Sequence, residues 1–198
     1  MRIKSNWFKN GRKRTPQEIA GALAFVIWRI GDNALKNTRN AKFEIAIGTQ
    51  YFSFLGEFLI FLIQVADRIA YRQLSAEDRM AFTSALANRV AETLAENQSR
   101  LIGNSIEKHK QYFIDMLNQR AGEYADFKYN NNGPDFAFTR YLGYCMREVM
   151  DEKDAAWVID QMMGIEAPEA VTMVEKTMHD LFETDPRQPR SRKTVSGD

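Results

Sequence analysis

One segment limits the fold more than any other. Between Tyr51 and Ala70, apolar residues occur on nearly every side of the helix that the spacing predicts over about 41–73. A helix that is apolar all round must be covered by other protein elements or by lipid. The apolar stretch 52–66 is shorter than the roughly 20 residues that a bilayer requires, and it contains serine, glutamate and glutamine. We therefore expect a long, central, mostly buried helix of a globular fold.

The rest of the chain also has the pattern of helices. Thr15, Pro16 and Glu18 combine an N-cap threonine, a first-turn proline and a glutamate at the third helical position, which together mark a helix start. Ser75 has the same N-cap character. No stretch alternates between apolar and polar residues as a half-buried strand does. The sequence therefore predicts an all-α fold, a bundle of six or seven helices in a single domain over residues 15–184.

The boundaries in the C-terminal third are less uniform. Asn130–Pro134 is the clearest loop, and Asp135 follows it as the N-cap of another helix. The charged run Asp151–Asp154 either splits one helix or joins two. Gly164 is expected to end a helix, and Pro168 to open the last one in its first turn.

Charge is distributed very unevenly along the chain, although its formal net charge is only +1. Residues 1–14 hold six basic residues and no acid, and residues 187–198 hold four basic residues and one acid. The remainder is therefore acidic. The pattern predicts a basic N-terminal arm over 1–14 and a disordered basic tail over 185–198, joined to an acidic body.

The predicted central helix carries a stripe of polar residues. Glu57, Gln64, Asp67 and Tyr71 are separated by seven, three and four positions, which places them on one helical face. Such a stripe can be a solvated seam, with Asp67 near Tyr71 or a neighbouring arginine. It can also line a binding cavity or ligate a metal. Burying a carboxylate is costly unless the group is paired, so Glu57 is the residue on which these alternatives differ most.

The large apolar side chains allow two further interpretations. Gly48 and Gly56 lie eight residues apart and would let the central helix pack closely against a symmetry mate, which favours a homodimer. Alternatively, the helix lines a cavity for an apolar small molecule or lipid, with Glu57 or Gln64 as the polar anchor. The aromatic residues expected around that cavity are Tyr51, Phe52, Phe58 and Phe61.

The sequence offers little support for catalysis. Carboxylate-bridged di-metal bundles use a Glu-x-x-His element on two helices, but Ile and Lys precede the two histidines by three residues. Cys145 lies among apolar residues and is interpreted as a packed, inert thiol. No phosphate-binding glycine loop or nucleophile motif is present. We expect no metal or cofactor, and a carboxylate-dependent metalloenzyme is the third hypothesis.

The functional interpretation depends mainly on the basic arm. This arm couples Trp7 to Arg12, Lys13 and Arg14, which suit contact with a partner. Another protein, the acidic body of this or a second copy, or weak binding to an anionic membrane surface would each fit, whereas nucleic acid is disfavoured by the acidic body. The leading hypothesis is a non-catalytic, homodimeric interaction protein. Its lone cysteine favours a cytoplasmic location.

Overall fold

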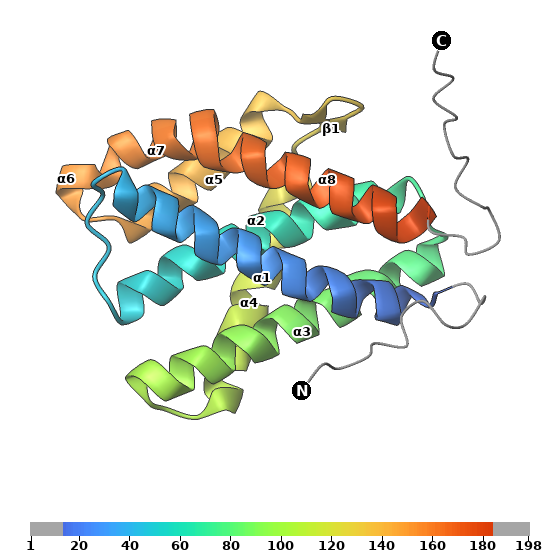
Figure 1. Ribbon diagram of the computed structural model, residues 1–198, viewed down its shortest axis with the longest axis horizontal. Coiled ribbons are helices and arrows are strands. Elements are labelled where there is room, and N and C mark those ends of the chain that lie inside the picture. Colours follow the sequence, from blue (N-terminus) through green and yellow to red (C-terminus); the bar gives the residue numbers. More distant parts are fainter. Residues whose placement is uncertain (1–13, 184–198) are drawn as a thin grey trace, which may run out of the picture.

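The computed structural model describes residues 14–183, and they confirm the all-α class (Figure 1). Within this described range, six helices have 14 to 27 residues, and strand is confined to one pair of two-residue segments. The elements in chain order are α1 (Pro16–Asn40), α2 (Thr49–Tyr71), α3 (Ala76–Ile102), α4 (Ile106–Tyr124), β1 (Tyr129–Asn130), β2 (Gly133–Pro134), α5 (Phe136–Val149), α6 (Glu152–Ala155), α7 (Trp157–Gln161), the π-helical segment η2 (Met162–Glu166) and α8 (Ala167–Glu183).

Helix α2 is the centre of the bundle. It packs against α1, α3, α4, α5 and α8, and its residues 54–66 are buried without interruption. Figure 1 shows α1 crossing in front of α2, with α8 on one side and α3 on the other. This arrangement covers the helix on all sides, as its composition requires. The prediction of a central, mostly buried helix is confirmed.

The predicted start of that helix at residue 41 is wrong, because α1 continues to Asn40 and α2 begins only at Thr49. The backbone of the connection 41–48 is held by side chains from elsewhere. Glu44 N donates to Asp154 Oδ2 at 2.7 Å, and Ala46 N donates to Gln50 Oε1 at 2.6 Å. Gly48, with φ of +118°, then supplies the turn into α2, a conformation that side chains rarely adopt.

The three predicted helix N-caps are confirmed. Thr15 Oγ1 accepts a hydrogen bond from Glu18 N, and the Glu18 carboxylate accepts one from Thr15 N, which completes the capping box. Ser75 and Asp135 each accept a hydrogen bond from the backbone N–H three residues later. These bonds satisfy donors that the first helical turn leaves free.

The C-terminal third departs from expectation at one position. The charged run Asp151–Asp154 starts a new helix rather than continuing the previous one, since α5 ends at Val149, Asp151 is the N-cap residue of the short α6, and the other three residues of the run lie in α6. Gly164 does not end a helix, because α7, η2 and α8 follow one another directly and the π-helical segment passes through this glycine. The last helix begins at Ala167, one residue before Pro168.

The π-helical segment brings a carboxylate into the interior. Glu166 is 2% exposed and accepts hydrogen bonds from Gln161 Nε2 at 2.9 Å and Asn37 Nδ2 at 3.4 Å. Burial raises the pKa of Glu166 above its ordinary value, and the two amide donors only partly offset this effect. The folded protein therefore holds a proton at Glu166 more tightly than the unfolded chain does.

Glu166→Gln should stabilise the protein increasingly as the pH rises from 4 to 7. A raised pKa in the folded state gives stability that is present below the unfolded pKa and is lost as the pH rises through the folded pKa. Glutamine removes that loss and keeps an oxygen acceptor. The measurement is the difference in melting temperature from wild type across this range. Glu96→Gln, at an exposed position of α3, is the control, and a difference that does not change with pH would contradict the assignment.

Candidate functional site

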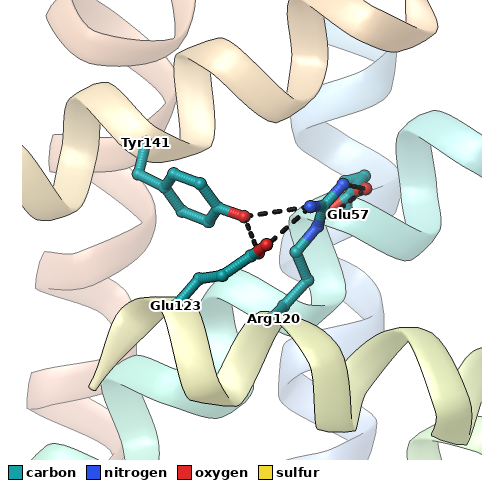
Figure 2. Close-up of polar contacts among 4 residues, drawn as sticks. All are labelled: Glu57, Arg120, Glu123 and Tyr141. Atoms are coloured by element: carbon teal, nitrogen blue, oxygen red, sulfur yellow. Dashed lines mark hydrogen bonds and ion pairs between the residues drawn. The ribbon is translucent and has the colours of Figure 1, made fainter. Parts of the chain in front are cut away.

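Glu57 lies inside the bundle, where α4 supplies its partner. Its carboxylate accepts hydrogen bonds from Arg120 Nη2 at 2.7 Å and Nε at 3.1 Å (Figure 2). The Glu57 side chain is 7% exposed and the Arg120 side chain 20%. Two parallel hydrogen bonds of this kind fix the relative position of the groups as well as neutralising the buried charge. The solvated-seam interpretation of the stripe therefore fails at Glu57.

Arg120 also links this pair to α5. Its Nη1 donates to Glu123 Oε2 at 3.1 Å and to Tyr141 Oη at 2.9 Å, and the Tyr141 hydroxyl donates to the same Glu123 oxygen. Figure 2 shows the guanidinium between Glu57 on one side and the Glu123–Tyr141 pair on the other. We call Glu57, Arg120, Glu123 and Tyr141 the buried polar network. It connects α2, α4 and α5.

Two titratable groups lie next to this network. Burial, followed by the charge of nearby Glu57, raises the pKa of the Cys145 thiol to about 12. Burial likewise raises the pKa of Tyr124. A thiol that keeps its proton at neutral pH is a poor nucleophile. The interpretation of Cys145 as a packed thiol agrees with its burial.

A cleft of about 620 Å³ opens above Glu57, bounded by α2, α3, α4 and the end of α5. Most of its inner surface is apolar. Gly56 of α2 allows Met116 of α4 to pack closely at the cleft wall, since a Cβ at this position would lie 3.1 Å from Met116 Cε. The lining residues are Ala46, Thr49, Gln50, Phe52, Ser53, Glu57, Leu94, Gln98, Tyr112, Phe113, Met116, Glu148, Val149 and Asp151.

The mouth of the cleft is acidic and aromatic. Glu148 and Asp151 are exposed, and neither has an ion-pair partner among residues 14–183. Tyr112, on the wall formed by α4, is 65% exposed. An apolar interior with unpaired carboxylates and an aromatic ring at its rim suits an occupant that combines apolar groups with positive charge.

The residues predicted to share one site with Glu57 lie elsewhere. Asp67 accepts hydrogen bonds from Arg79 and from Thr83 Oγ1 at 2.7 Å, so it joins α2 to α3. It borders a separate hollow of about 300 Å³. Gln64 is buried on α2 but does not line the cleft. Phe61 is fully buried in the aromatic core.

The expected aromatic cavity and glycine seam also differ from the structure. Phe52 lines the cleft, whereas Phe58 packs against Phe61 with ring centroids 6.0 Å apart. Gly48 precedes α2, and Gly56 faces α4 of the same chain. The prediction that these two glycines form one face open to a symmetry mate is therefore wrong.

Of the residues assigned to the basic arm, the structure describes only Arg14, whose Nη1 donates to Leu181 O of α8 at 3.2 Å. Trp7, Arg12 and Lys13 lie outside the described residues. The sequence did not identify Arg120, Glu123, Tyr141 or Glu148 as site residues, and it marked Asp151 only as part of the charged run 151–154. A signal existed for Arg120, because it is spaced by three or four positions from Leu117 and Tyr124 on the inward face of its helix.

Among residues 14–183, no group of three or more histidine, cysteine, aspartate or glutamate side chains is placed to hold a metal ion. No helix in this range is both long enough and apolar enough to cross a membrane. Comparisons with protein-family models, with curated proteins and with solved structures found no match. Function is therefore inferred from the cleft and the network beneath it.

Proposed function

We propose that this chain is a non-catalytic interaction protein whose cleft receives a basic and aromatic segment of a partner polypeptide. The observation that carries the proposal is the combination of an apolar interior with the unpaired carboxylates of Glu148 and Asp151 at its mouth. Aromatic side chains can pack against the half-buried Met116 and the exposed ring of Tyr112, above the buried Phe113. Lysine or arginine beside them can pair with the two acids.

The buried polar network supports a binding role over a reactive one. Both Glu57 oxygens already accept hydrogen bonds from Arg120, and the third Arg120 nitrogen bonds Glu123 and Tyr141. The floor of the cleft is therefore a rigid and internally satisfied surface. A preorganised floor lowers the entropy cost of binding an occupant. The cytoplasmic location expected from the lone cysteine forms part of the proposal.

The test is binding of a fluorescein-labelled, 14-residue synthetic peptide of tryptophan, phenylalanine, lysine and glycine. The protein carries Trp7→Ala and Phe8→Ala, so that the arm of a second copy does not compete. We expect saturable binding that weakens roughly tenfold or more with Glu148→Lys and Asp151→Lys, because like charges then meet at the mouth. Binding should not be detected for the same peptide with glutamate in place of lysine.

The control carries Glu77→Lys and Glu169→Lys, which make the same change in net charge at exposed positions away from the cleft. Equal losses in the two charge variants would show a nonspecific electrostatic effect and overturn the proposal. So would equal binding of the lysine and glutamate peptides.

A small amphipathic molecule is the second candidate, because a volume of about 620 Å³ lies within the range of small-molecule sites. Native mass spectrometry of freshly purified protein, repeated under denaturing conditions, would release such a molecule. A compound recovered at one equivalent, and lost with Met116→Lys at the cleft wall, would favour this candidate over the polypeptide.

A further inference from the structure

The acidic mouth of the cleft and the start of α1, which the basic arm precedes in the sequence, lie at opposite ends of the bundle. Residues 148–154 lie against the connection that follows α1 and the first turn of α2, since Glu44 N donates to Asp154 and Gln50 Nε2 donates to Val149 O at 3.2 Å. The arm precedes the first turn of α1, near the C-terminal half of α8. Figure 1 shows the beginning of α1 and the connection after its end on opposite sides of the molecule.

Helix length prevents the arm from reaching the mouth in its own chain. With 25 residues, α1 is about 37 Å long. An extended chain covers at most about 3.5 Å per residue, so Trp7 stays within roughly 28 Å of Thr15 and Arg12 within roughly 11 Å. The arm therefore cannot place Trp7 and Arg12 together at Glu148 and Asp151 of the same chain.

The arm nevertheless has the chemistry that the cleft requires. Trp7 and Phe8 are adjacent aromatic residues, followed by Lys9 and Arg12. The cleft offers the half-buried Met116 and the exposed ring of Tyr112 to aromatic side chains. Its two mouth carboxylates, which have no ion-pair partner among residues 14–183, are available to the cations. Tryptophan and arginine are the residues that most often dominate protein interfaces.

We propose that the cleft binds residues 7–12 of a second copy of this chain, and that the two copies exchange their arms. This inference rests on the proposed function and names its partner. Because each arm starts at one end of α1 and binds at the other end of the partner's α1, the two subunits lie side by side and antiparallel. Reciprocal exchange closes a two-fold dimer, with both arms bound and no open site left. The homodimer expected from the sequence thus gains an interface that does not involve Gly56.

The test measures the dimer dissociation constant of the full chain by sedimentation velocity. We expect wild type to be dimeric at micromolar concentration. The arm variant, Trp7→Ala with Phe8→Ala, and the cleft variant, Glu148→Lys with Asp151→Lys, should each weaken the dimer roughly thirtyfold or more, as loss of an aromatic anchor or a charge pair does. The control with Glu77→Lys and Glu169→Lys should dimerise like wild type.

Mixing the two variants gives the sharpest result. The arm variant keeps an intact cleft and the cleft variant keeps an intact arm, so a mixed dimer retains one of its two arm–cleft contacts. The mixture should therefore form heterodimers at concentrations at which each variant alone is monomeric. A monomeric wild type, or an arm variant that stays dimeric, would overturn the inference.

The sedimentation and peptide-binding results together distinguish a failure of the arm exchange from a failure of the proposed function. If wild type is monomeric but the synthetic lysine peptide binds the cleft, the partner is another protein and only the exchange is wrong. If wild type is monomeric and the peptide does not bind, both are wrong. If wild type is monomeric and a small molecule is recovered from the cleft, the second candidate replaces them.

Discussion

Arg120→Met should lower the free energy of unfolding by about 3 kcal/mol, the lower end of the cost of breaking a buried ion pair from one side. The substitution keeps an apolar stem of similar length but leaves the Glu57 carboxylate, 7% exposed, without its cation. The lower end applies because the Arg120 side chain is 20% exposed, so that water can partly replace it. Chemical denaturation at pH 7 measures the change.

A second substitution separates loss of charge pairing from loss of packing. Glu57→Gln together with Arg120→Met removes both charges, so the double variant should be more stable than Arg120→Met alone. Arg100→Met, at an exposed position of α3, is the control. Equal stability of the single and double variants would show that packing, rather than pairing, carries the effect.

Local signals explain why so much of the fold could be predicted. The capping residues Thr15, Ser75 and Asp135 act within three positions of themselves, and their hydrogen bonds form as the sequence indicates. The central helix is equally local in origin, because its composition alone requires cover on all sides. Such features depend little on which other elements provide that cover.

The errors arise where distant residues hold the backbone. The connection 41–48 has helix-forming residues in its first half, but Glu44 N bonds to Asp154, 110 positions further along the chain. Gly164 has the residue type of a helix end, yet the packing of α7 and α8 carries the backbone through it as a π-helix. In neither segment does the local sequence favour the observed conformation over the predicted one.

In the candidate site, too, the local features were predictable and the contacts between distant residues were not. Glu57 was recognisable from sequence as a carboxylate too costly to bury alone, but Arg120 lies 63 positions away. Its place on the inward face of α4 indicates that it is buried without indicating which acid it pairs with. The cleft was not predictable, because it is a space between helices. Its acidic mouth forms only when the end of α5 meets the first turn of α2.

Phe61→Ala should lower the free energy of unfolding by about 3–5 kcal/mol, the range for removing a buried phenylalanine from a packed core. Phe61 is fully buried, and its ring centroid lies 5.8 Å from that of Phe138 and 6.5 Å from that of Tyr124. These rings join α2 to α4 and α5, the same helices that the buried polar network connects. Phe136→Ala, at a position that is 67% exposed, should change stability by less than about 0.5 kcal/mol.

The same variant decides between the core and the ligand interpretations of Phe61. If the residue only supports the walls of the cleft, the folded fraction of Phe61→Ala should bind the lysine peptide within about twofold of its parent, well under the tenfold that 1.4 kcal/mol represents. If the residue lines an apolar ligand cavity, the variant should lose a bound molecule in native mass spectrometry while remaining close to wild type in stability. A large fall in stability with unchanged peptide affinity would assign Phe61 to the core and leave binding to the residues at the cleft mouth.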